Sequence, residues 1–264
     1  MKNSLPIGRM SEFIGNFRAI LFTPEHLGIV KDGPSERRKF TDCALSQLYS
    51  TYVCDLQSYN KILMQRNKLL SEATTGDMHA FSETAELWSD QLAFYCERIS
   101  RARQEYLEEL SKTASEIFSD MTSGREVLTL EYEGAKSKEE YFALLTENID
   151  KELRYKTTLY GIHKDDIGIY IDSKPARVFG SQGQQRSASL AMKIAEGEIS
   201  KKITGEYPVF LFDDIFSELD RHRREYIVKG MNDRQVIITA CEDKDQQLFR
   251  SSYRIFCKNG RFFT

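Results

Sequence analysis

The stretch VFLFDDIFSELD at residues 209–220 decides the fold class, because it joins an apolar run to a cluster of acids. Its first four residues are all apolar, which is typical of a strand covered on both faces in a parallel sheet. A predicted helix at about 217–230 follows, and a second apolar run, Val236–Thr239, comes after it. This β-α-β alternation predicts an α/β fold with a mostly parallel sheet.

Two adjacent acids, Asp213 and Asp214, come directly after the first apolar run. Open α/β sheets bind their ligands at the carboxyl ends of the strands. In a nucleotide site, Asp213 would hold Mg²⁺, usually through water, and Asp214 would orient or deprotonate the attacking water. The alternative is a strand that simply runs out into an acidic turn.

The stretch GSQGQQR at residues 180–186 is the second candidate motif. Ser181 and Gln184 have the spacing of a capping box, which would start a helix that continues to about residue 202. Gly183 does not serve the cap, since a glycine inside a first turn costs about 1 kcal/mol relative to alanine. A glycine is useful there if a phosphate or another backbone must approach closely, and a plain helix cap is the alternative. The residues that follow would let the helix lie close on a sheet: Ala188, Leu190, Ala191, Ile194, Ala195 and Gly197.

The third candidate motif is Ser217-Glu218-Leu219-Asp220, which follows the two acids. Taken alone, it is also compatible with a helix N-cap whose acidic residues lie near the positive end of the helix dipole.

Residues 35–122 are predicted to be helical almost throughout. Leucines and tyrosines recur at spacings of three and four residues over 45–70, interrupted by Arg66, and a second apolar stripe runs over 85–117. Two amphipathic helices joined at 74–77 predict an antiparallel hairpin, an arm roughly 50–60 Å long at about 1.5 Å per residue. The basic groups along it are interpreted as solvated faces rather than a DNA site: Arg37-Arg38-Lys39, and Arg98, Arg101 and Arg103.

Shorter elements are predicted on both sides of the arm. Ala19–Phe22 is a strand candidate, and the two runs 127–132 and 167–171 are strand candidates that flank a helix near 136–157. The chain closes with a hairpin that turns at Asn259-Gly260.

The composition excludes several classes of protein. The chain has 264 residues and a net charge of -3, so any contact with nucleic acid must come from a local basic surface. No apolar run approaches the roughly 18 residues of a membrane span, and the N-terminus lacks a signal-peptide pattern. The five cysteines form no Cys-x-x-Cys pair, and no histidine lies near them at metal-ligand spacing. This pattern indicates a reducing cytoplasm and no structural zinc.

The order of the motifs resembles an ABC-type ATPase, in which a signature Ser and Gly, a Mg²⁺-binding acid and a following loop recur at similar separations. More narrowly, segments from about Phe13 to the end resemble the RecF family of recombination-repair proteins: FTPEHL, GPSERRKF, YNKILMQRN, GIHKDD, GSQGQQR and FLFDDIFSELD. The resemblance implies an ABC-ATPase head lobe with an inserted α-helical hairpin arm. It divides the chain into a part of the head (1–33), the arm (34–125) and the C-terminal lobe of the head (126–264).

The resemblance also implies partners and roles. In that family, two ATP-bound heads close as a homodimer on gapped DNA or at a junction between single strand and duplex, and they help to place RecA together with RecO and RecR. The implied roles are contact with ATP in trans for Ser181, Gln182, Gly183 and Gln184, coupling of the two ATP sites for Ser217, Glu218, Leu219 and Asp220, Mg²⁺ binding for Asp213, and catalysis through the attacking water for Asp214.

The chain departs from a complete ABC ATPase in several ways. It has no Gly-x-x-x-x-Gly-Lys-Ser/Thr loop, the motif that cradles phosphates. Gln182 fills the first glycine position of the generic signature, and Asp214 stands where most ABC ATPases have Glu. No switch histidine follows the run 236–239, and His163 of GIHKDD is expected to have a structural hydrogen-bonding role. We interpret the chain as lacking the family's first segment, and expect it to be inactive alone and slow as part of a complete ATPase.

Two other functions stay open at this stage. The first is a structural fragment that binds DNA or docks a protein without nucleotide chemistry. The second is the ATPase subunit of a transporter, which is disfavoured because its arm would be short and its acid pair is usually Asp-Glu. A phosphate-binding loop encoded upstream of Met1 would decide the class.

Overall fold

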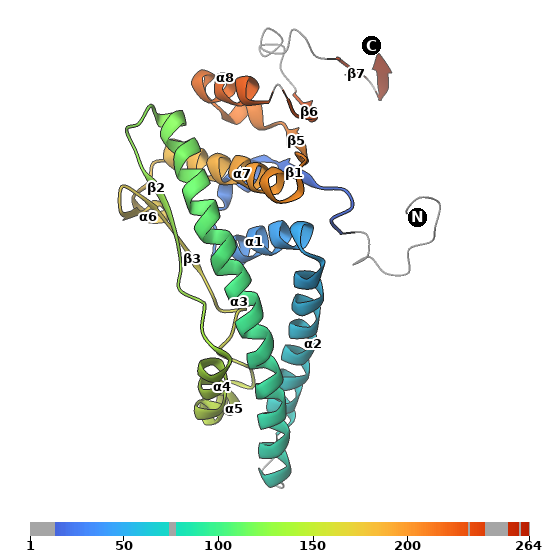
Figure 1. Ribbon diagram of the computed structural model, residues 1–264, viewed down its shortest axis with the longest axis vertical. Coiled ribbons are helices and arrows are strands. Elements are labelled where there is room, and N and C mark those ends of the chain that lie inside the picture. The colour runs from blue at the N-terminus through green and yellow to red at the C-terminus, as the bar shows by residue number, and fades with distance from the viewer. Residues whose placement is uncertain (1–13, 74–77, 232, 241–252, 259, 264) are drawn as a thin grey trace.

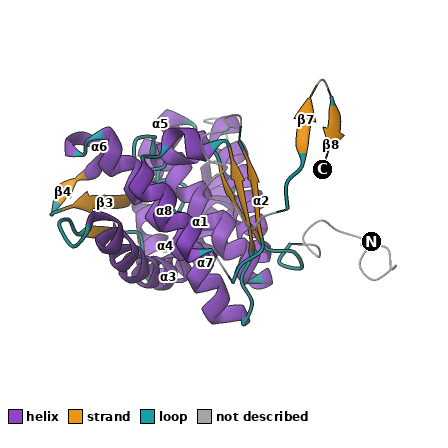
Figure 2. Ribbon diagram, turned by 90° about the horizontal axis from the view of Figure 1, so that it is seen from above, coloured by secondary structure: helices purple, strands orange, loops and turns teal. Residues whose placement is uncertain are grey.

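A computed structural model describes residues 14–73, 78–231, 233–240, 253–258 and 260–263. Its spine is α3 (Met78–Thr122), which contacts α2, α4, β2 and α7 along its length. Figure 1 shows α2 beside α3 in one half of the molecule, and α7, the parallel sheet and α8 at the other end. Seen from above, the strands β3 and β4 lie on the opposite side of α3 and α7 from the parallel sheet (Figure 2).

The first sheet is parallel and has the strand order β1-β5-β6. Its strands are β1 (Ala19–Phe22), β5 (Val209–Asp213) and β6 (Val236–Thr239), with Phe22 level with Phe212 in the register. This confirms the predicted α/β fold and its parallel strands.

One face of the parallel sheet is well covered and the other is not. Alternate residues of β1 and β5 are buried, and their Phe22 and Phe212 rings stack with centroids 4.3 Å apart. On the opposite face, Leu21 is 41% exposed and Ile237 is 53% exposed. The expectation of strands covered on both faces therefore holds for one face only among the described residues.

The helix that covers the buried face is α7 (Gln182–Thr204), which ends at Gly205 in the left-handed conformation. Gly197 allows the close approach, because a Cβ there would lie 2.3 Å from the Phe210 ring and 3.3 Å from Ile20. The small residues of this helix thus let it lie close on the sheet, as the sequence predicted.

The second sheet is antiparallel, with the order β2-β3-β4. Its strands are β2 (Leu128–Tyr132), β3 (Ile167–Ile171) and β4 (Lys174–Pro175). Helices α4 (Lys138–Glu147) and α5 (Ile149–Tyr155) lie between β2 and β3 in the chain, where one helix was predicted. The short helix α6 (Ala176–Phe179) links β4 to the start of α7.

The arm consists of two antiparallel helices, α2 (Ser50–Glu72) and α3, preceded by α1 (Pro34–Leu48). The predicted continuous stripe breaks at Tyr49, whose extended backbone separates α1 from α2 and leaves its side chain 43% exposed. The connection at 74–77 lies outside the described residues.

The prediction that the arm arginines are solvated is wrong for two of them. Arg37 is 5% exposed and pairs with Asp166, and Arg103 is 2% exposed and pairs with Asp42 and Asp165. Arg98 and Arg101 do lie at the surface. Each buried arginine faces carboxylates from segments distant in sequence, and this pairing compensates for the cost of burying its charge.

The remaining elements are short. They are the 3₁₀ helices η2 (Pro24–Gly28) and η3 (Ile215–Glu218), the helix α8 (Arg221–Gly230) and the hairpin of β7 (Phe256–Lys258) and β8 (Arg261–Phe263). Gly260 has φ +73 in the hairpin turn, and its neighbour Asn259 lies outside the described residues. Over the described part of the chain, none of the helices combines the length and apolarity needed to cross a membrane.

Candidate nucleotide site

The first turn of α7, Ser181–Gln184, is here called the signature turn. The predicted capping box is present: Ser181 Oγ accepts from the Gln184 backbone N–H at 3.2 Å, and Gln184 Oε1 accepts from the Ser181 N–H at 2.7 Å. Ser181 and Gln182 are exposed, and Gly183 is half-buried. The turn therefore presents its polar groups at the protein surface.

Neighbouring side chains hold the signature turn in place. Gln184 Nε2 donates to Glu126 Oε1 at 2.7 Å, which ties the turn to the segment between α3 and β2. Gln185 Nε2 donates to the carbonyl oxygens of Ala176 at 2.9 Å and Gly180 at 3.1 Å, and so fastens α6 to the same turn. Gln184 and Gln185 of GSQGQQR thus hold neighbouring segments in place as well as the start of α7.

Among the described residues, none packs so closely against Gly183 that a side chain there would be excluded. The nearest heavy atoms to an added Cβ would be Arg223 Nη2 at 3.7 Å and Ser181 Oγ at 4.0 Å, which are ordinary van der Waals contacts. Its φ does not lie in the left-handed region either. A glycine inside a helix costs about 1 kcal/mol of helix propensity relative to alanine, and the contacts of the described residues do not require it here.

A groove of about 480 Å³ opens beside the signature turn. Residues from the end of α3, the signature turn and the start of α8 line it: Met121, Thr122, Arg125, Glu126, Ser181, Gly183, Gln184, Asp220, His222 and Arg223. The structure thus brings the second and third sequence motifs to one groove, together with the end of the arm.

The third motif spans two elements. Ser217 and Glu218 lie in η3, Leu219 is 3% exposed, and Asp220 is the N-cap of α8, where its side chain accepts from the Arg223 backbone N–H at 3.0 Å. The helix begins at Arg221 rather than near residue 217, because Asp220 caps it and a 3₁₀ turn fills the preceding residues.

The acid pair sits at the carboxyl end of β5, apart from the groove lining. Asp213 Oδ1 accepts from Thr239 Oγ1 at 2.6 Å, and the Asp214 backbone N–H donates to Thr239 O at 3.2 Å. Asp214 has φ 50, a left-handed conformation that aspartate tolerates better than most residues and that is often found at functional sites.

The carboxylates of Asp213 and Asp214 are ligands of the kind that Mg²⁺ prefers. Within the described residues, no cluster of three or more His, Cys, Asp or Glu could hold a metal ion by itself. Mg²⁺ is commonly bound by one or two carboxylates together with waters and substrate phosphates. Asp213 and Asp214 match that partial donor set.

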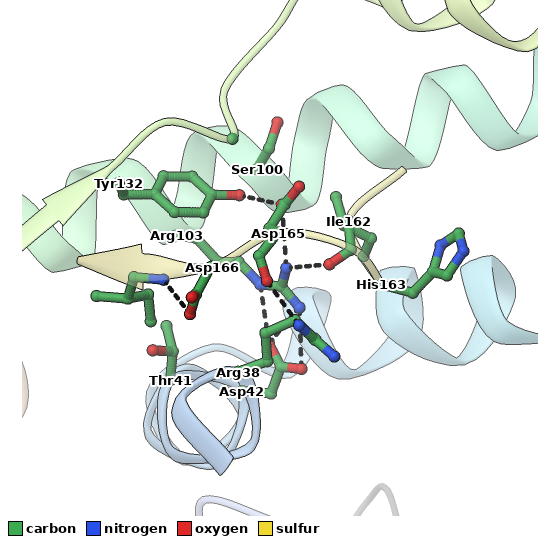
Figure 3. A network of polar contacts seen from close by, with 12 residues as sticks. Arg38, Thr41, Asp42, Ser100, Arg103, Tyr132, Ile162, His163, Asp165 and Asp166 are labelled. Atoms are coloured by element: carbon green, nitrogen blue, oxygen red, sulfur yellow. Dashed lines mark hydrogen bonds and ion pairs between the residues drawn. The ribbon is translucent and has the colours of Figure 1, made fainter. Parts of the chain in front are cut away.

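A separate polar network lies at the base of the arm, between α1, α3 and the GIHKDD loop (Figure 3). Arg103 Nη2 donates to Asp42 at 3.0 Å, Arg103 Nη1 donates to the Ile162 carbonyl at 2.8 Å, and Tyr132 Oη donates to Asp165. Burial raises the pKa of the Asp165 carboxyl, against the lowering effect of the Tyr132 hydrogen bond and the Arg103 charge. The charged and polar groups of this network hydrogen-bond to one another, which indicates a structural role.

His163 is part of the same region and has the structural role that was expected. Its Nδ1 lies 2.6 Å from Tyr59 Oη and its Nε2 lies 3.1 Å from the Thr158 carbonyl oxygen. Since a carbonyl only accepts, Nε2 carries the proton and Nδ1 accepts from the tyrosine. Burial lowers the pKa of the imidazole to about 4, so the ring is neutral at physiological pH.

Comparison with known proteins identifies the chain. No family model matches it. A solved structure of the recombination mediator protein RecF-ATPrS in the RecFOR pathway aligns with a TM-score of 0.82 at 35% identity, covering 90% of this chain and 66% of that one. The fold is that of an ABC-type ATPase head lobe with a helical arm. The DNA replication and repair protein RecF of Clostridium perfringens (strain SM101 / Type A) is 38% identical over 266 residues, covering 98% of this chain and 72% of that protein. The chain belongs to the RecF family of DNA replication and repair proteins.

Two further comparisons support the same family assignment. RecF of Clostridium novyi (strain NT) is 40% identical over 242 residues, covering 90% of this chain and 66% of that protein. A structure of RecF-ATP in the RecFOR pathway aligns with a TM-score of 0.79 at 36% identity, covering 88% of this chain and 64% of that one. The chain thus spans about two thirds of these solved RecF chains.

Six lining residues of the groove were missed by sequence reasoning: Met121, Thr122, Arg125, Glu126, His222 and Arg223. Of these, Glu126 and Arg223 hydrogen-bond to the signature turn. Glu126 precedes a strand and carries no local pattern that links it to Gln184. Arg223 follows the Asp220 cap at a helical spacing, but nothing in the sequence indicates that its side chain reaches α7.

Proposed function

We propose that this chain works as part of an ATP-dependent RecF dimer, with its signature turn closing on the phosphates of ATP held by a second subunit. The observation that carries the proposal is Gly183, a glycine without an internal reason at the mouth of an open groove. A helix N-terminus favours an anion, because free N–H groups and the helix dipole both point toward it. The Ser181 hydroxyl adds a polar group on the same exposed turn.

The acids on β5 would serve a different phosphate group. Asp213 would hold Mg²⁺ together with phosphate oxygens, and the ion would neutralise charge that develops on them. Asp214, displaced by its left-handed backbone, would orient the attacking water. Ser217–Asp220 would connect these acids with the groove. A change at this chain's own ATP site would then be coupled to the ATP site of its partner.

The partners follow from the family. A relative is named a recombination mediator of the RecFOR pathway. We propose that this chain shares that role in the cytoplasm: it binds gapped DNA or a junction of single strand and duplex, works with RecO and RecR, and aids RecA loading.

An association assay tests the trans contact. The chain is mixed with the RecF protein whose ATP-bound structure is 36% identical to it, and complex formation is measured by light scattering with and without ATP and Mg²⁺. The expected result is a complex that forms only with ATP. Ser181→Arg should abolish it, because a long cation would fill the space that the phosphate must enter.

Two variants separate this role from helix capping. Ser181→Asn keeps a good cap, since Asn ranks with Ser at that position, but it places a bulkier amide in the phosphate path. Ser137→Arg breaks the capping box of α4, which lies outside the groove lining, and should leave the complex intact. A Ser181→Arg chain that still forms the ATP-dependent complex would show that GSQGQQR is only a cap.

A further inference from the structure

Arg223 reaches from the start of α8 to the signature turn. Its Nε donates to Ser187 Oγ at 2.6 Å and its Nη2 donates to the Gly183 carbonyl at 3.2 Å, while Nη1 pairs with the Asp220 carboxylate. One guanidinium therefore contacts both the third motif and the first turn of α7. A planar fork with several donors suits such a bridge, whereas an ammonium would act as a single point charge.

The contacts on α7 sit at the turn that carries the proposed phosphate contact. Ser187 is fully buried, and its own hydroxyl also donates to the Gly183 carbonyl at 2.8 Å. Arg223 thus holds the Gly183 carbonyl, and both residues line the groove. The side chain is 24% exposed, and partial burial lowers the pKa of its guanidinium.

The arginine two residues earlier offers a natural contrast. Arg221 is 90% exposed, and its guanidinium is paired with Glu225 on its own helix. Both arginines belong to the first turn of α8 and both have carboxylate partners. Of these two, Arg223 is the one that hydrogen-bonds to α7.

We infer that Arg223 is a positioning residue that holds the signature turn and the Asp220 end of the third motif together, so that they meet a second subunit as one rigid surface. This inference rests on the proposed function and deepens it. The link has a mechanical consequence, since the chain from Asp213 to Asp220 joins the acid pair to the same bridge. A change at the acids would then be passed to the turn that faces the partner's nucleotide.

Hydrogen exchange on the chain alone tests the bridge without nucleotide. In Arg223→Gln, amides within residues 182–188 should exchange at least about tenfold faster than in the wild type, while amides in the arm stay unchanged. Arg221→Gln is the matched control and should change neither region. Unchanged exchange at 182–188 in Arg223→Gln overturns the inference.

The association assay with ATP-bound RecF then tests the function of the bridge. Arg223→Gln should weaken the ATP-dependent complex at least about tenfold, Arg223→Lys should restore part of the loss, and Arg221→Gln should match the wild type. A wild-type affinity for Arg223→Gln overturns the positioning role and leaves the proposed function standing. Failure of the wild-type chain to form the complex overturns the proposed function, and the positioning role with it, whereas the exchange result still reports on the bridge itself.

Discussion

The arm and the groove beside the signature turn both contain arginines with several partners, yet the two regions differ in what surrounds those arginines. In the arm, Arg66 is fully buried, and its guanidinium pairs with the equally buried Glu152 at 2.7 Å. Its other donors reach Ser89, Thr158 and the Leu145 carbonyl. Beside the signature turn, Arg223 is partly exposed and lines the groove of about 480 Å³.

The difference teaches how to separate structural from functional polar clusters in this protein. A cluster whose charged groups pair with one another and are shielded from water has no room for a ligand, and it serves packing and register. A cluster at an open groove keeps polar groups available to a partner, and it can give up stability for that purpose. Gly183 is an example of such a loss of stability, since a glycine lowers the helix propensity of the exposed signature turn.

The largest expected effect comes from opening the buried cluster of the arm. Arg66→Met should lower the free energy of unfolding by about 3–5 kcal/mol, because it leaves the Glu152 carboxylate buried without a cation. Urea melts measure it. Arg101→Met, which removes an arginine whose side chain is 68% exposed, should stay within about 0.5 kcal/mol of the wild type. A loss below about 1 kcal/mol for Arg66→Met would mean that the pair is not shielded from water.

The second effect is a pH dependence of stability that comes from His163. The folded-state pKa of its imidazole is lowered from 6.5 to about 4. Between these two pH values the unfolded chain binds a proton at His163 that the folded chain does not bind. The free energy of unfolding is therefore highest above about pH 6.5, and it falls as the pH is lowered toward 4. The loss should be about 2–3 kcal/mol. Urea melts from pH 7 to pH 4 should show a shallower decline in His163→Gln, and parallel curves for the two proteins would refute the assignment.

The smallest expected effect compares two capping boxes in the same chain. Ser137 caps α4 and Ser181 caps α7 with the same pair of hydrogen bonds. Alanine at either position should cost about 1 kcal/mol of stability, measured by thermal or urea unfolding. Only the Ser181 variant should also weaken the complex with ATP-bound RecF. Equal losses of complex formation in both variants would mean that stability alone explains the result.

Much of the candidate site could be predicted from the sequence, because its features are local. A capping box, an apolar strand and an acid pair each depend on residues a few positions apart, and their order along the chain indicated the family. The start of α8 was predicted several residues too early, because Ser217 and Asp220 are both acceptable caps by sequence. The side chain of Asp220, which accepts from the Arg223 N–H, is the cap that the structure contains.

The sequence by itself determined the order of the elements and the identity of the turn that carries the signature, since periodicity and capping are set by near neighbours. Only the tertiary structure decided that Arg66 and Arg103 are buried and that Arg223 bridges two motifs. A charged residue is expected to be exposed unless a partner is known, even at a position such as Arg66 that interrupts an apolar stripe, and the partners here lie on other elements. A long side chain finds such a partner only after the helices and sheets have packed, and the partner then decides whether the charge stabilises the core or serves the site.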